Sequence, residues 1–189
     1  MTIPPRSAFA GYARQVLEDH GEWDSPHKFL ALHWDGGKLT CGIYVCIMTD
    51  IHPDQYPALM LKTAQESLVK CPESPPYGYL LQCEAFSVTE PGPDASEEER
   101  RQYESDRAGR TFHERPDAVE SAVVYCADIH GRLWSAVKLR SDPDVISESF
   151  HPPGQAAPAG QYITALLGVC DMTAVAGHKL PPAGFRHPN

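Results

Sequence analysis

Residues 28–48 read KFLALHWDGGKLTCGIYVCIM, two apolar runs on either side of the tripeptide Asp35-Gly36-Gly37. Alternate residues of the second run share one apolar face, namely Leu39, Cys41, Ile43, Val45 and Ile47. An Asp-Gly pair between two such runs favours a tight turn, because glycine adopts positive φ without steric cost. The stretch therefore predicts a β-hairpin.

A second hairpin is predicted over residues 119–140. Apolar and more polar residues alternate up to His130-Gly131, and the alternation resumes at Leu133. Residues 77–90 have the same period and predict a single further strand. Two hairpins and one strand give about five strands joined mostly by short turns, which favours a mainly antiparallel or mixed sheet.

Three main helices are predicted around this sheet. Apolar residues recur at intervals of three and four residues near positions 7–20, 53–70 and 161–176, as expected for a helix with one buried face. The whole chain, residues 1–189, therefore indicates a single α+β domain in which helices pack on the sheet.

The segment 91–116 interrupts these patterns and is rich in acidic residues. Ser96 and Glu99 have the spacing of a helix capping box. Tyr103 is, however, the only sizeable apolar residue before Phe112. A helix without an apolar stripe has little to hold it against a core, so we expect a solvated helix or a mobile insert.

Two other stretches show neither period. Residues 141–160 are rich in proline, and residues 181–189 combine proline with glycine and polar residues. We expect irregular chain in the first stretch and a loose tail in the second.

Composition limits the class of protein. The formal net charge is −9, which disfavours binding to nucleic acids or anionic membranes, because phosphate groups attract basic surfaces. The longest mainly apolar stretch, residues 162–175, is too short and too polar to span a membrane. The first residues also lack the features of a signal peptide. We therefore expect a cytoplasmic protein.

The six cysteines include no Cys-x-x-Cys pair. Most of them fall within predicted strands or helices, and a cytoplasmic chain does not retain disulfides. We expect them to be small buried apolar side chains.

The tripeptide Asp-Ile-His occurs twice, each time at the end of a predicted strand. Residues two apart on a strand point to the same side, so each Asp and His could hold one ion jointly. Asp50, His52, Asp128 and His130 together offer a ligand set suited to zinc, manganese or iron, which could activate a water for hydrolysis. The alternative is structural: Asp50 caps a helix and His130 belongs to a turn.

Five further residues are candidates for binding. Phe112, His113, Glu114 and Arg115 combine an aromatic, a base and an acid at the end of the acidic insert. Loops of this composition often bind partners, but others only connect elements. Trp134 is the fifth candidate, because basic residues follow it on the same strand face.

No motif in the sequence identifies a reaction. The chain has no Gly-x-Ser-x-Gly, Gly-x-Gly-x-x-Gly, phosphate-loop or His-Glu-x-x-His pattern. This favours a non-catalytic binding or accessory protein without a cofactor, which acts on a protein partner or forms a homodimer through a sheet face or edge. The alternative is a small metal-dependent hydrolase that uses the two Asp-x-His pairs with zinc or manganese.

Overall fold

The computed structural model describes residues 3–48, 52–109, 111–155 and 160–182, with only the backbone described for 43–48 and 53. In chain order its elements are α1 (Arg6–Glu18), β1 (His27–Trp34), β2 (Leu39–Met48), η1 (Pro53–Gln55), α2 (Tyr56–Lys70), β3 (Gly78–Ser87), α3 (Glu97–Gly109), η2 (Phe112–Glu114), β4 (Val119–Asp128), β5 (Leu133–Leu139), β6 (Asp142–His151) and α4 (Gln161–Ala176). The strands form one antiparallel sheet in the order β2-β1-β3-β4-β5-β6.

Both predicted hairpins are confirmed, β1–β2 and β4–β5. At the first turn, Asp35 Oδ1 accepts hydrogen bonds from the backbone N–H groups of Gly37 (2.9 Å) and Lys38 (2.7 Å). Gly36 has a φ of 94°, and Gly131 in the second turn has a φ of 78°. These are conformations that glycine adopts readily and most other residues avoid.

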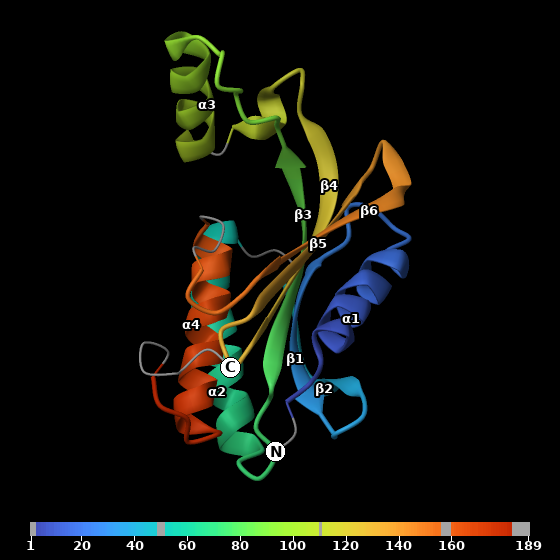
Figure 1. The fold of residues 1–189 in the computed structure, drawn as a ribbon, viewed down its shortest axis with the longest axis vertical. Helices are drawn as coiled ribbons and strands as arrows, with labels where there is room; N and C mark the ends of the chain where they lie inside the picture. Colours follow the sequence, from blue (N-terminus) through green and yellow to red (C-terminus); the bar gives the residue numbers. More distant parts are fainter. Residues whose placement is uncertain (1–2, 49–51, 110, 156–159, 183–189) are drawn as a thin grey trace.

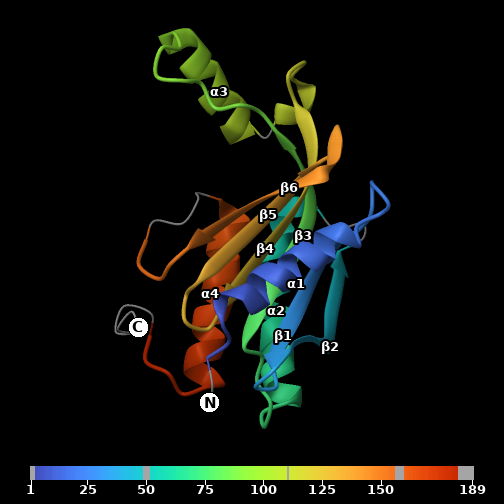
Figure 2. The same ribbon diagram turned by 45° about the vertical axis from the view of Figure 1, so that its right-hand side comes forward.

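Helices cover both faces of the sheet (Figures 1 and 2). The helix α1 lies on one face, where Phe9, Ala13 and Leu17 are buried. The helices α2 and α4 lie side by side on the other face, where Met60 and Leu166 are fully buried. The apolar spacing that predicted these three helices therefore corresponds to the sides that face the sheet.

The prediction of about five strands is corrected to six. The additional strand, β6, lies within residues 141–160, which the sequence analysis assigned to irregular chain. β6 pairs with β5 from Ile146, opposite Lys138, to His151, opposite Leu133. None of its residues is buried. The strand is held by backbone pairing more than by burial, so it leaves no clear alternation in the sequence.

The three main helices are confirmed, and the acidic insert forms a fourth helix, α3, which is the solvated helix that was one of the two expectations for this segment. Most of the predicted tail, residues 183–189, lies outside the described residues. Among the helices that the structure describes, none has both the length and the apolar character needed to cross a bilayer.

The five described cysteines are free thiols. Cys83, Cys126 and Cys170 are buried, as predicted, whereas Cys71 is half-buried and Cys41 is exposed. Burial raises the pKa of Cys83 to about 12 and raises the pKa of Cys126 well above its usual value. These two thiols therefore stay protonated at neutral pH and are poor nucleophiles.

Candidate functional site

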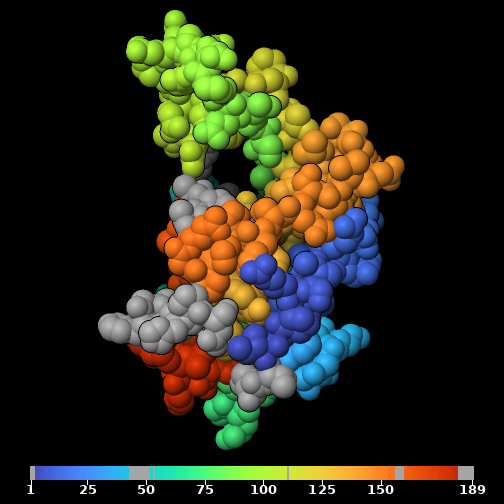
Figure 3. Space-filling view, viewed as in Figure 1, coloured from blue at the N-terminus to red at the C-terminus, as the bar shows by residue number. Residues whose placement is uncertain are grey.

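The most distinctive surface feature is the connection between β3 and β4, residues 88–118, which we call the arm. The two strands stay paired as far as Ser87 and Val119, and the chain then leaves the sheet. Figures 1 and 2 show that α3 stands away from the other helices and from the sheet, and Figure 3 shows the arm projecting beyond the rest of the surface. The predicted binding residues Phe112, His113 and Arg115 all lie in this arm.

The predicted capping box is present at the N-terminus of α3. The Ser96 backbone N–H donates to Glu99 Oε2 at 2.7 Å, and the Glu99 N–H donates to Ser96 Oγ at 3.2 Å. Hydrogen bonds from the hydroxyl and the N–H of Ser96 lower the pKa of Glu99. The first turn holds three glutamates, Glu97 to Glu99, which the positive end of the helix dipole favours.

At the other end of α3, a buried carboxylate fixes the helix to the returning chain. Asp106 is the one buried residue of α3, and it accepts hydrogen bonds from Gln102 Nε2 (2.7 Å) and from an Arg115 terminal nitrogen (3.1 Å). Arg115 also binds both carboxylate oxygens of Asp117, at 2.8 and 3.0 Å. The Asp117 and Asp106 carboxylates raise the pKa of Arg115. These two ion pairs of Arg115 hold the C-terminal end of α3 against the chain that returns to β4.

A cleft of about 360 Å³ lies inside the arm. It is lined by Thr89, Glu90, Pro91, Gly92, Ala95, Glu99, Gln102 and Arg115. The side chains of Glu99, Gln102 and Arg115 already have partners within the arm. These three side chains in the lining of the cleft are therefore engaged in contacts that hold the arm together.

The other predicted binding residues of the arm lie at its base. The ring of Phe112 packs on Tyr103 of α3, with 5.3 Å between ring centroids. The exposed His113 lies beside Phe86 of β3 at 6.0 Å, and Glu114 is 3.7 Å from His113. Phe86 is itself 45% exposed. The base of the arm thus presents an aromatic pair to solvent.

Trp134 does not belong to this surface. It is 4% exposed, and its ring stacks on Phe9 of α1 at 4.6 Å with 7° between the planes. The ring of Phe150 in β6 also packs on Trp134, with 5.2 Å between the ring centroids. Trp134 is therefore part of the core under α1, where it has no access to a partner.

Asp128 and His130 have structural partners at the β4–β5 turn. Asp128 is fully buried, and its Oδ1 accepts hydrogen bonds from the backbone N–H groups of His130 and Arg132, both at 3.0 Å. Arg132 Nε donates to its other oxygen at 2.7 Å. His130 Nε2 lies 2.7 Å from the Tyr77 hydroxyl. These contacts fix the turn.

The structure does not bring His52 to this pair. Met48, the last residue of β2, is level with the first residue of β1. Asp128 is opposite Gly78, which is level with the far end of β1. β2 therefore ends, four residues before His52, at the end of the sheet opposite to Asp128. Asp50 lies outside the described residues, so the metal-site hypothesis gains no geometry from the part of the chain that is described.

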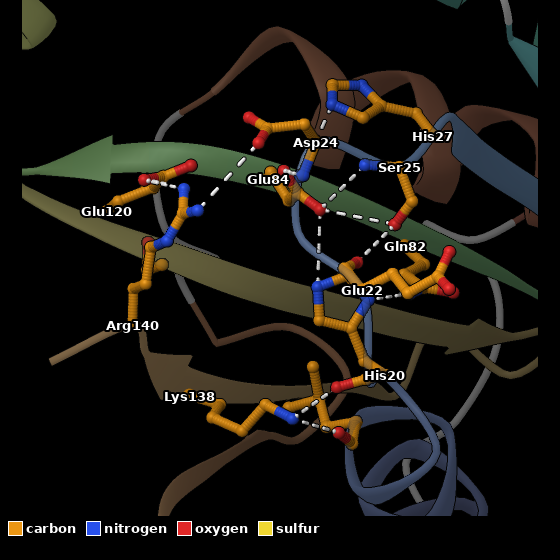
Figure 4. A network of polar contacts seen from close by, with 12 residues as sticks. His20, Glu22, Asp24, Ser25, His27, Gln82, Glu84, Glu120, Lys138 and Arg140 are labelled. Atoms are coloured by element: carbon orange, nitrogen blue, oxygen red, sulfur yellow. Dashed lines mark hydrogen bonds and ion pairs between the residues drawn. The ribbon is translucent and has the colours of Figure 1, made fainter. Parts of the chain in front are cut away.

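Sequence reasoning missed a polar network between α1 and the sheet (Figure 4). Its centre is Glu84 of β3, which accepts hydrogen bonds from the backbone N–H groups of Asp24 (2.8 Å) and Ser25 (3.2 Å). His20 Nε2 lies 3.2 Å from Glu84 Oε1, and His20 Nδ1 lies 2.9 Å from Gln82 Nε2. The network joins residues about 60 positions apart, so no local sequence signal could reveal it.

Two histidines of this network are kept neutral by their surroundings. Burial lowers the pKa of His20, against the opposing effect of Glu84 and together with that of Lys138. Burial also lowers the pKa of His27, whose Nε2 accepts a hydrogen bond from the Glu84 N–H at 3.3 Å. With Gln82 donating to Nδ1, a neutral His20 carries its proton on Nε2, the nitrogen that lies 3.2 Å from Glu84 Oε1.

One group of potential metal ligands occurs within the described residues, at the edge of this network. Oxygens of Asp24, Glu84 and Glu120 lie within 4.8 Å of one another. Arg140 pairs with Glu120 at 2.6 Å and reaches Asp24 at 3.8 Å. The chain itself therefore supplies the positive charge, and this cluster of acids is accounted for without an ion.

No protein-family model matches the chain, and no curated protein or solved structure is significantly similar to it.

Proposed function

We propose that the protein is a non-catalytic binding protein and that the arm is the element that contacts its protein partner. The observation that supports this is α3 itself. Twelve of its thirteen residues are not buried, yet its two ends are fixed by a capping box and by the Asp106 ion pair. A helix that buries almost nothing adds little to the stability of the fold, so its defined shape is better explained by an external contact.

The base of the arm provides an apolar centre for such a contact. Phe86 and His113 are exposed beside each other, and Arg140 lies over the ring of Trp23 at 5.3 Å on the same side of the sheet. Aromatic and arginine side chains dominate the binding energy of many protein interfaces. Charged residues of α3 around this centre would steer association.

Charge favours a different protein over a second copy as the partner. The arm, residues 88–118, has nine acids and five arginines, an excess of four negative charges. Two arms placed against each other would bring like charges together, which opposes association. A partner with a basic surface fits this charge.

Site-specific photo-crosslinking tests the proposal. A photoreactive residue replaces Glu104, which is exposed on α3, and in a matched control it replaces Val69, which is 79% exposed on α2. Both full-length chains are expressed in the cells that make the protein, irradiated and analysed by mass spectrometry. We expect one protein to be captured from position 104 and not from position 69. No capture at 104, or the same products from both positions, would contradict the proposal.

A further inference from the structure

The segment that joins α1 to β1, residues 19–26, is tied to the sheet mainly through one carboxylate, and we call this segment the strap. Glu84 of β3 accepts hydrogen bonds from the backbone N–H groups of Asp24 (2.8 Å) and Ser25 (3.2 Å) and from the Ser25 hydroxyl (3.3 Å). The strap contains no helix or strand. Asp24 also has a φ of 64°, a conformation that costs energy in residues other than glycine. The strap therefore depends on Glu84 to keep its conformation.

The strap also contributes to the surface that we assign to the partner. The Arg140 guanidinium lies over the ring of Trp23 at 5.3 Å. Arg140 pairs with Glu120 at 2.6 Å, and Glu120 is opposite Phe86 in the β3–β4 ladder. Side chains of directly opposed residues lie on the same face of a sheet. One row of side chains therefore runs from the strap to Phe86 at the base of the arm.

His20 is the buried titratable group of the strap (Figure 4). Its side chain is 3% exposed, and its ring packs edge-on against Trp23 with 5.3 Å between centroids. Nε2 lies 3.2 Å from Glu84 Oε1, and Nδ1 lies 2.9 Å from the Gln82 amide nitrogen. The neutral imidazole satisfies both contacts when Gln82 donates to Nδ1. A second proton would go on Nδ1, where it would face the N–H group of Gln82 and break that hydrogen bond.

The surroundings of His20 oppose a positive charge on its ring. Burial is the largest cause of the lowered pKa of His20, and Lys138 of β5 and Lys28 of β1 act in the same direction. The Lys138 ammonium also donates to the His20 carbonyl oxygen at 2.7 Å. Glu84 acts in the opposite direction, but its oxygens already accept three hydrogen bonds from the strap. A strap that has left the sheet would return His20 to the ordinary histidine pKa of about 6.5.

We infer that protonation of His20 releases the strap from Glu84 and so weakens the binding of the partner at the base of the arm. The released strap binds the proton more readily than the closed strap. Lowering the pH below about 6.5 therefore shifts the equilibrium toward release, by up to about tenfold per pH unit for one proton. Release takes Trp23 away from Arg140 and disrupts the row that ends at Phe86. The effect on the partner rests on the proposed function of the arm, whereas the release itself does not.

Amide hydrogen exchange followed by NMR, on the full-length protein alone, tests the release. The reporters are the backbone N–H groups of Asp24 and Ser25, which Glu84 binds in the closed strap. We expect their protection factors to fall as the pH is lowered from about 7 to about 5, and to stay constant in His20→Gln. His151→Gln, at the last position of β6, is the matched control and should behave like the wild type. An equal fall in His20→Gln would overturn the role of His20.

A carboxylate at position 82 tests the sign of the effect. In Gln82→Glu the new carboxylate accepts a hydrogen bond from a protonated Nδ1, so the closed strap binds a proton more tightly than the released strap. Acid should then raise the protection of the Asp24 and Ser25 amides instead of lowering it. Protection that falls with acid in this variant as it does in the wild type would contradict the inference.

The effect on the partner is measured with the protein captured from position 104, in purified form. We expect its affinity for the wild type to fall below pH 6.5 by up to about tenfold per pH unit, and its affinity for His20→Gln to change less. An equal change for both chains would overturn the regulation and leave the arm as the binding element. If no protein is captured from position 104, the proposed function fails, while the exchange experiment still decides whether His20 releases the strap.

Discussion

The carboxylate of Glu84 fixes the chain between α1 and β1. It binds the backbone of Asp24 and Ser25 and lies against the imidazole of His20. Asp24 has a φ of 64°, a conformation that is uncommon outside glycine. Hydrogen bonds to a charged group are each worth about 1.5–3 kcal/mol, enough to hold this local strain. His20 and His27 lie beside this carboxylate, and their own burial lowers their pKa values against its opposing effect.

The lowered pKa values of His20 and His27 predict that the folded protein loses stability on acidification already at pH values above those at which carboxylates titrate. In the unfolded chain a histidine takes up a proton near pH 6.5, whereas in the folded protein it does so only at lower pH. Below pH 6.5 the unfolded state therefore binds more protons, and stability falls as the pH falls. We expect the free energy of unfolding, measured in urea, to decrease between pH 7.5 and 5.5.

A substitution at His20 measures how much of this pH dependence comes from that residue. His20→Gln should reduce the pH slope of the unfolding free energy by up to one proton, about 1.4 kcal/mol per pH unit. His113→Gln, at an exposed position, is the control and should leave the slope unchanged. A slope in His20→Gln equal to that of the wild type would show that burial does not hold this imidazole neutral.

Lys138 of β5 binds backbone carbonyls at the C-terminal end of α1. Its side chain is buried, and its Nζ donates to the carbonyl oxygens of Leu17 and His20, both at 2.7 Å. The Leu17 carbonyl also accepts a hydrogen bond from the His20 N–H at 3.2 Å, and His20 itself lies just beyond the end of α1. Lys138→Met keeps most of the volume and removes both hydrogen bonds, so we expect a loss of about 2–4 kcal/mol in urea unfolding.

The exposed Lys70→Met on α2 is the matched substitution and should change stability by less than about 0.5 kcal/mol. If both variants unfolded at the same urea concentration, the capping role of Lys138 would have to be abandoned.

At the scale of elements, the sequence predicts what is local and misses what depends on distant partners. The turn at Asp35 and the capping box at Ser96 can be predicted from the sequence, because the interacting residues are within a few positions of each other. β6 could not be predicted, because an edge strand that buries few side chains leaves no apolar alternation in the sequence. The Glu84 network is missed for another reason: its partners come from separate elements, and only the register of the sheet brings them together.

The order of α3 is predicted to depend on Asp106. Asp106→Ala removes the acceptor for Gln102 and Arg115, and with few apolar contacts to replace it the helix should unfold locally. We expect the amide protons of α3 to lose their protection from hydrogen exchange, while those of β3 and β4 keep theirs.

Glu104→Ala on the same helix is the control, because its side chain is exposed and makes only a 4.0 Å contact with Arg107. The expectation is wrong if α3 amides in Asp106→Ala stay as protected as in this control.

For the whole molecule, the structure separates a body, made of the sheet with α1, α2 and α4, from an arm that projects from it (Figure 1). Because the β3–β4 ladder reaches Ser87 and Val119, an Asn-Gly turn can replace residues 89–117 and close these strands as a short hairpin. We expect this armless chain to melt within about 4 °C of the intact protein, a change of about 1 kcal/mol or less. A much lower melting temperature in a calorimetric scan would show that the arm stabilises the body.

The central claim is that the arm is where this protein meets its partner. The most direct test is a titration of the protein captured from position 104, in purified form, against the intact chain and against the armless chain. We predict that the armless chain binds at least tenfold more weakly, a loss of about 1.4 kcal/mol or more. Equal affinity for the two chains would contradict the claim.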